Sequence, residues 1–395
     1  MSANAAAEVP VGCNPNARNR RSFLKDSLVT GGAIAGATVL GAPKLFAQAS
    51  PSTSAQSSIF ASSERLTTGD VAILKFLAAA ELIESDLWTQ YAELGGIGNN
   101  PPIELDPNQG SELNPYQMAL SNLDSDGPQY ITSNTLDEVS HATFLDAYLV
   151  SKGEAPVNFD EFRTLQGSTA TGSSNIGRLT NLMHLNVDTS WYVRYRSTTN
   201  PDFGATFPQA VTITNRTAIP VNNTDLHGTA AHLQVIANTA AFHFGYIEQG
   251  GSSLYQAMSQ KVSSLEVLKI TLGIGGDEIA HFLEWVDFAG NGVQATVAPV
   301  TDGGLTFPDF FNNPPLQPAN LVQPSLIFPV PCEFISPNLP HCAVIRPSDD
   351  KFAGAVATIQ SFTADGLFVG QTPHFLQLLN HLAQEADAAT RQVLF

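Results

Sequence analysis

Two Glu-x-x-His motifs are the strongest chemical signal in this sequence. They are Glu138-Val-Ser-His141 and Glu278-Ile-Ala-His281. On an α-helix, residues three apart lie about 60° apart around the axis and about 4.5 Å apart along it. A carboxylate and an imidazole at this spacing can therefore bind one metal ion. Oxygen and imidazole ligands without thiolate suit iron or manganese, although zinc would also be accepted.

Two further glutamates can complete such a site. Glu81 lies among apolar neighbours, and Glu248 follows the apolar run AAFHFGYI. The two halves of the chain echo each other, since Glu81-x₆-Trp88 and Glu248-x₆-Tyr255 each precede a Glu-x-x-His motif. Glu84, one turn after Glu81, can replace or assist it. We favour Glu81, because its spacing to an aromatic residue matches that of Glu248.

Electrostatics favours a metal site for these glutamates. Four glutamates facing one interior repel each other, and each bare buried carboxylate costs several kcal/mol. Without metal they would have to take up protons at raised pKa values. Two divalent cations cancel four negative charges. His243, five residues before Glu248, lies about 140° round a regular helix from it, so we interpret it as a core histidine rather than a ligand.

Helical periodicity places all four segments on helices. The first expected helix covers residues 71–94. The second runs from a cap at Ser133 or Asn134 to 152, and the third from just after Asp225 to 258. The fourth runs from a capping box of Ser263 and Glu266 to about 289. We interpret residues 96–130 as loop. Residues 153–224 form a long connection, with one helix expected near 176–187. A glutamate from each of two helices, plus Glu-x-x-His from the other two, is the ligand pattern of di-iron and di-manganese carboxylate bundles.

At this point the chain resembles a known family. Residues of about 70–290 resemble the bacterial ferritin-like domain family that also takes in plant desiccation-related proteins. The resemblance is carried by AELIESDLW, DEVSHATFL, IEQGGSSLYQ and GDEIAHFLEW. It implies an all-α, ferritin-like four-helix bundle over 67–292 with a long crossover at 153–224. It also implies that two iron or manganese ions are bound by Glu81, Glu138, His141, Glu248, Glu278 and His281.

The sequence departs from the family pattern at two places. Trp88 stands where a tyrosine is common, and a tryptophan supplies no phenol near the metals. Gly250-Gly251 next to Glu248 leaves the regularity of the third helix open. A further glycine cluster, at 273, 275 and 276, either weakens the fourth helix or allows close helix approach.

The last hundred residues differ in character from the rest. Residues 293–347 hold 11 of the 25 prolines, which favours a non-repetitive wrap over the bundle rather than a helix or a regular sheet. Cys332 and Cys342 are interpreted as one disulfide in an oxidising compartment. We expect two helices near 351–362 and 373–394.

The first 49 residues have the features of an export signal. Residues 19–25 (NRRSFLK) form a twin-arginine pattern, a weakly apolar stretch runs from Ser27 to Gly41, and Ala47-Gln48-Ala49 supplies a cleavage site. We expect export of the folded protein by the twin-arginine route to the periplasm or beyond, with no stable membrane span after cleavage. Residues 50–66 are interpreted as a Ser/Ala-rich linker.

Composition limits the remaining function classes. The 395 residues carry a net charge of −18, with 43% hydrophobic and 14% charged side chains. This excludes a disordered, collagenous or disulfide-dense chain and disfavours nucleic-acid binding. We expect a metal-binding protein that uses O₂ or peroxide with a small reductant. The alternative is a structural or stress-protective envelope protein with at most a structural metal. An oligomer is compatible with either function, but a 24-subunit cage is not expected, because long insertions surround the bundle.

Overall fold

The computed structural model describes residues 65–97, 113–194, 200–205, 211–310, 312 and 329–392. These residues belong to one compact unit, Phe60–Phe395. The expected signal segment, nearly all of the linker and part of the proline-rich segment lie outside the described residues.

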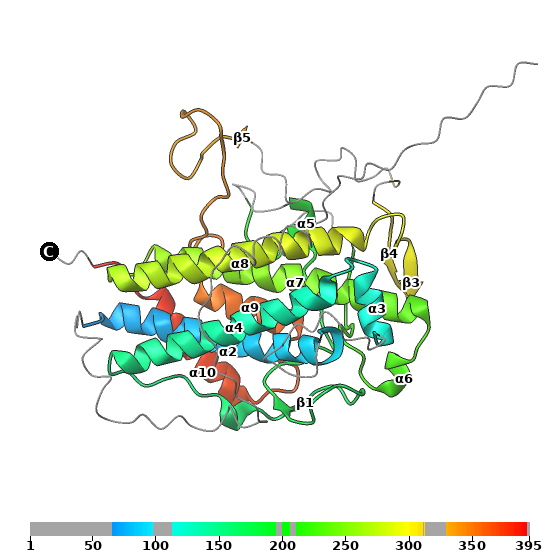
Figure 1. Ribbon diagram of the computed structural model, residues 1–395. Helices are drawn as coiled ribbons and strands as arrows, with labels where there is room; N and C mark the ends of the chain where they lie inside the picture. The colour runs from blue at the N-terminus through cyan, green and yellow to red at the C-terminus, as the bar shows by residue number, and fades with distance from the viewer. Residues whose placement is uncertain are drawn as a thin grey trace, which may run out of the picture. The chain divides into compact units, whose positions relative to one another are not determined.

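The described chain is mostly helical, which confirms the all-α fold class. Four long helices run along a common direction (Figure 1): α2 (Thr68–Gly95), α4 (Gly127–Ser151), α7 (Ala230–Ser259) and α8 (Leu265–Asn291). Helix α2 packs against α4, and α7 packs against α8. The other helices are shorter: α3 (Pro115–Ser121), α5 (Ser190–Arg194), α6 (Asn223–Leu226), α9 (Ala355–Asp365), α10 (Pro373–Asp387) and the 3₁₀ turn η1 (Asp160–Phe162).

Side-chain caps set the starts of three long helices. Thr67 caps α2, Thr229 caps α7 and Ser264 caps α8, each by accepting a backbone N–H from the first turn. The cap of α8 expected at Ser263 is therefore wrong by one residue. The Asp70 carboxylate explains the difference, because it accepts the backbone N–H groups of both Ser263 and Ser264 and so ties this turn to the start of α2.

The loop expected over residues 96–130 is partly helical. Helix α3 lies within it, with Pro115 in the first turn and a capping box between Asn114 and Gln117. Helix α4 also begins earlier than expected, at Gly127, and Pro128 occupies its first turn. Pro115 and Pro128 both lie in a first turn, where a helix tolerates proline.

The helix expected near residues 176–187 does not form. Its backbone groups bind other parts of the chain instead. Strand β2 (Gly177–Arg178) pairs with β1 (Leu165–Gln166), and the Asp86 carboxylate of α2 accepts the backbone N–H groups of Leu179 and Thr180. Tertiary contacts thus override the local helical period here.

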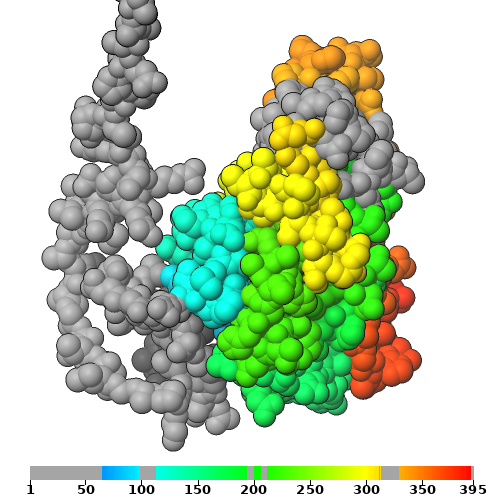
Figure 2. All heavy atoms as spheres, turned by 90° about the vertical axis from the view of Figure 1, so that its right-hand side faces the viewer, coloured from blue at the N-terminus to red at the C-terminus, as the bar shows by residue number. Residues whose placement is uncertain are grey.

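The C-terminal part packs onto the long helices. Helices α9 and α10, orange and red in Figure 1, correspond to the two expected helices, but α9 begins at Ala355 rather than 351 and α10 ends at Asp387 rather than 394. Helix α10 packs against α2. Between them and α8 the described wrap contains two short hairpins, β3 (Val300–Asp302) with β4 (Leu305–Phe307), and β5 (Pro329–Val330) with β6 (Cys342–Ala343). At one end of the helices, α3 and the β3–β4 hairpin lie over α7 (Figure 2).

The expected disulfide is not present. Cys332 and Cys342 are both free thiols. The register of the β5–β6 hairpin explains this, because it pairs Cys342 with Val330, while Cys332 lies two residues further along and pairs with Ser336 in its own turn.

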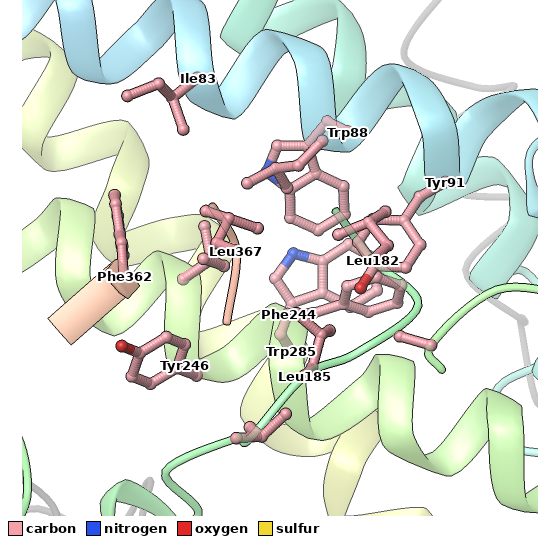
Figure 3. Close-up of a cluster of buried hydrophobic side chains, with 14 of the residues drawn as sticks. Ile83, Trp88, Tyr91, Leu182, Leu185, Phe244, Tyr246, Trp285, Phe362 and Leu367 are labelled. Carbon is pink, nitrogen blue, oxygen red and sulfur yellow. The ribbon is translucent and has the colours of Figure 1, made fainter. Parts of the chain in front are cut away.

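An aromatic cluster fills the interior between α2, α7 and α8 (Figure 3). Trp88 stacks on Trp285 with ring centroids 5.4 Å apart, and Phe244 contacts both rings. Trp88 is fully buried, so this tryptophan is a core residue. None of the described helices combines the length and the apolar character that crossing a membrane requires.

Candidate metal centre

The structure brings all six residues of the expected ligand set together. They come from four helices: Glu81 from α2, Glu138 and His141 from α4, Glu248 from α7, and Glu278 and His281 from α8. Their potential ligand atoms form two groups, and within each group all the atoms lie within 4.8 Å of one another. The groups are Glu81, Glu138, His141 and Glu278, and Glu138, Glu248, Glu278 and His281.

The two groups share Glu138 and Glu278. These shared carboxylates come from the two Glu-x-x-His motifs, so the motifs supply both the common ligands and one histidine for each group. Each group also has one glutamate of its own, Glu81 or Glu248. The cluster is therefore symmetric in its chemistry, as the echo between the two halves of the sequence suggested.

The glutamates of this cluster are buried with unsatisfied oxygens. Glu81, Glu138, Glu248 and Glu278 are at most 1% exposed. One oxygen each of Glu81 and Glu248, and both oxygens of Glu278, have no hydrogen-bond partner. Buried polar atoms are normally hydrogen-bonded, because leaving one unpaired costs about 1–3 kcal/mol, and more for a charged group. Coordinated cations would satisfy these oxygens.

Both histidine rings aim Nδ1 at the carboxylates. Nδ1 of His141 lies 3.2 Å from Glu138 and 3.5 Å from Glu81. Nδ1 of His281 lies 3.0 Å from Glu138 and 3.4 Å from Glu248. The same nitrogen of each ring thus faces the space that the carboxylates surround.

Two aspartates hold the far side of these rings. Nε2 of His141 lies 3.3 Å from Asp277, and Nε2 of His281 lies 3.3 Å from Asp137. A carboxylate on one ring nitrogen fixes the tautomer and frees the other nitrogen for a metal. Neither aspartate was anticipated from the sequence, although each directly precedes the glutamate of its motif. The repeated Asp-Glu-x-x-His pattern was the available signal.

Asn134 and Tyr255 position three of the glutamates. The Asn134 amide donates to Glu138 at 3.0 Å and to Glu248 at 2.9 Å. The Tyr255 hydroxyl donates to Glu81. Asn134 was not anticipated from the sequence, and Tyr255 served there only as a spacing marker. Asn134 precedes Glu138 by one helical turn and therefore lies on the same face of α4.

Burial and mutual repulsion shift the proton equilibria of the cluster. Burial, together with the neighbouring carboxylates, raises the pKa values of Glu278 and Glu84 well above the usual range of a glutamate. The same causes raise the pKa of Glu138 to about 7. Burial lowers the pKa of His141, but hydrogen bonds and charges of Glu138 and Glu81 outweigh it and raise the pKa to about 11. The metal-free cluster therefore retains protons at neutral pH.

Glu84 and His243 lie outside the two ligand groups. Glu84 is buried next to the cluster and one of its oxygens is unpartnered, but it belongs to neither group. His243 contacts Tyr91 and Asp365 instead of the glutamates.

The glycines near the cluster allow close packing. Helix α7 is continuous through Gly250 and Gly251. A Cβ at Gly251 would overlap the carboxylate of Glu278, and a Cβ at Gly275 would lie 2.7 Å from that of Tyr255. Helix α8 is likewise continuous through its glycines, so Gly275 allows α7 and α8 to approach.

Comparison with known proteins adds no relative from which a function can be transferred. No family model matches the chain, and no curated protein or solved structure is significantly similar to it.

Proposed function

We propose that this chain is an exported protein in which α2, α4, α7 and α8 form a ferritin-like bundle around two iron or manganese ions. The bound ions would react with O₂ or peroxide, using electrons from a small reductant. The observation that carries this proposal is the pair of ligand groups that share Glu138 and Glu278 and contain buried carboxylate oxygens without a hydrogen bond.

The residues fit this assignment by number and charge. Glu138 and Glu278 would be ligands common to both ions, Glu81 and His141 would complete the set for one, and Glu248 and His281 the set for the other. Four carboxylates balance two divalent ions, and the absence of thiolate among these residues suits iron or manganese. A pair of such ions supplies two-electron chemistry with oxygen species.

The residues around the cluster orient the ligands and set the protonation of the histidines. Asp137 and Asp277 would each hold an Nε2 proton, so that Nδ1 of both histidines stays unprotonated and available. Asn134 orients Glu138 and Glu248 through its two amide hydrogen bonds, and Tyr255 orients Glu81. These contacts fix the carboxylates before a metal arrives, which reduces the entropy lost on binding.

The function is tested by oxidant consumption. The chain without residues 1–49 is loaded anaerobically with Fe²⁺ or Mn²⁺, and loss of O₂ or H₂O₂ is followed with a ferrous or organic reductant present. Loaded protein should consume oxidant well above the metal-free level. A loaded protein that consumes neither oxidant with any such reductant would overturn the proposal.

A second candidate function is structural or stress-protective. The ligand set draws on all four long helices, so bound metal would cross-link them without any turnover. This alternative predicts a large rise in melting temperature on metal loading together with no oxidant consumption.

Substitution of the arginine pair tests the export route. Replacing Arg20 and Arg21 with lysine should leave an uncleaved precursor in the cytoplasm of a bacterial host, whereas the unmodified chain should appear shortened in the periplasmic fraction. Arg18→Lys, outside the pair, is the matched control and should export normally. Equal export of all three proteins would exclude the twin-arginine route.

A further inference from the structure

A line of aromatic contacts leads from the candidate metal centre into the core. The Trp285 indole N–H donates to the Asn134 oxygen at 2.7 Å, and the Asn134 amide in turn contacts Glu138 and Glu248. Trp285 stacks on Trp88, with ring centroids 5.4 Å apart and an interplanar angle of 23°. This side of the cluster is thus connected to two stacked indoles.

The line continues to Tyr91. Its ring centroid lies 5.7 Å from that of Trp88, and Figure 3 shows Trp88, Trp285 and Tyr91 grouped together. Each of these three side chains is at most 1% exposed. Indoles and phenols are the side chains that lose an electron most readily, and closely packed rings transfer electrons over such distances.

Tyr91 ends the line at a buried base. Its hydroxyl lies 2.7 Å from Nδ1 of His243, and Nε2 of His243 lies 3.1 Å from the Asp365 carboxylate. All three residues are at most 2% exposed. The Asp365 carboxylate next to Nε2 favours the tautomer with its proton on Nε2, in which the Nδ1 lone pair accepts the tyrosine hydrogen bond. This distance lies within the reach required for proton transfer.

Two other buried tyrosines, Tyr116 and Tyr255, have different hydroxyl partners. The Tyr116 hydroxyl, equally buried, donates to the backbone carbonyl of Ala218, which cannot take up a proton. The Tyr255 hydroxyl donates to Glu81, a carboxylate that metal binding would occupy. Proton removal matters because an oxidised phenol is a very strong acid, so its oxidation is favourable only when a base accepts the proton.

We infer that Tyr91 is a redox-active residue that passes one electron to the metal centre through Trp88 and Trp285, with His243 accepting its proton. The inference rests on the proposed function, because peroxide reduced at that centre is the oxidant. The O–H bond of Tyr91 breaks, an N–H bond forms at Nδ1 of His243, and a neutral tyrosyl radical remains. The resulting imidazolium faces the Asp365 carboxylate.

The electrons balance with an external reductant. Reduction of one H₂O₂ to two waters takes two electrons and two protons. Tyr91 supplies one electron and the reductant supplies the second, with the two protons coming from solvent. The reductant then returns an electron to the tyrosyl radical while His243 returns the proton, so that Tyr91 is restored.

The experiment is electron paramagnetic resonance on metal-loaded protein frozen after H₂O₂ addition, with peroxide consumption measured on the same samples. Ring-deuterated tyrosine identifies a tyrosyl signal by its altered hyperfine pattern. The signal should fall at least tenfold in Tyr91→Phe and in Trp88→Phe. It should persist in the matched control Tyr116→Phe, whose tyrosine is equally buried. Thermal melting confirms that each variant is folded.

The proton acceptor is tested separately. His243→Gln keeps a hydrogen-bond acceptor near Tyr91 but cannot take up a proton, so the radical yield should fall although the variant folds. Peroxide consumption without a Tyr91-dependent radical would overturn the inference and leave the proposed function standing. A signal that disappears in Tyr255→Phe and not in Tyr91→Phe would also overturn the inference and leave the proposed function standing.

Absence of both O₂ and peroxide consumption would instead remove the proposed function. The tyrosine is then tested in metal-free protein with a ruthenium tris-bipyridine photo-oxidant. Radicals formed on the half-buried Tyr130 and Tyr148 contribute equally to the spectrum of every variant. They therefore cancel when the spectrum of a variant is subtracted from that of wild type. A radical lost in Tyr91→Phe and in His243→Gln would support the redox-active pair, and an unchanged signal in Tyr91→Phe would overturn it.

Discussion

Replacing Gly251 with alanine is expected to weaken metal binding at least tenfold while leaving the fold intact. A Cβ at this position would overlap Oε2 of Glu278, the far end of a flexible side chain. The carboxylate can rotate away, so helix α7 survives, but Glu278 then leaves the position that both ligand groups share. Displacing a group that sets ligand geometry typically costs about 10–100-fold in metal affinity.

Gly250→Ala is the matched control for this substitution. A Cβ at Gly250 would meet Phe203 at 3.6 Å, which is ordinary contact. Alanine in a helix interior is about 0.8–1 kcal/mol more favourable than glycine, so both metal-free variants should melt at or slightly above the wild-type temperature. Only Gly251→Ala should lose the further rise in melting temperature on adding Mn²⁺. Calorimetry measures this rise, and a metal titration measures the affinity. An equal metal response in both variants would contradict the assignment of Glu278.

The metal-free protein should lose stability as the pH rises from about 5 to 8. Glu278, Glu84 and Glu138 have pKa values raised by burial and by each other, that of Glu138 to about 7. A carboxyl group whose pKa is raised on folding stabilises the fold below its unfolded pKa, and this contribution disappears as the pH rises through the folded pKa. The raised pKa of His141, about 11, acts in the same direction above about pH 6.5.

The expected size of this effect is on the order of 3 kcal/mol, because each pKa unit corresponds to about 1.4 kcal/mol. Thermal melting of metal-free protein should therefore show a fall of several degrees between pH 5 and pH 8. Bound metal requires the ionised carboxylates, so loaded protein should show the opposite slope or none. Glu138→Gln/Glu278→Gln should flatten the slope in the metal-free state. A metal-free melting temperature that rises over this range would contradict the raised pKa values.

Sequence reasoning located the long helices and the cluster because both depend on local periodicity. The four segments carrying Glu81, Glu138, Glu248 and Glu278 show helical spacing within about 25 residues, and the structure places all four on long helices. The Glu-x-x-His spacing is itself a helical property, so it placed each histidine beside its glutamate. The ferritin-like bundle, its metals, their chemistry with oxygen species and the export route are the parts that we propose.

Contacts between distant segments could not be predicted in the same way. The segment near residues 176–187 has a helical pattern, but the Asp86 carboxylate on α2 binds its backbone and keeps it extended. The crossed pairing of Asp137 with His281 joins residues 144 positions apart. Likewise, His243 and Asp365 come together only because α9 folds back onto α7. None of these partners has a signal in its own neighbourhood.

The most direct test of the central claim is the metal content of the chain without residues 1–49, measured by mass spectrometry after anaerobic loading. Wild type is compared with Glu138→Gln/Glu278→Gln, with the exposed-face Glu266→Gln on α8 as matched control. We expect about two iron or manganese ions per chain in wild type and in Glu266→Gln, and a large loss in the double variant. Metal-free wild type, or equal metal in all three proteins, would contradict this claim.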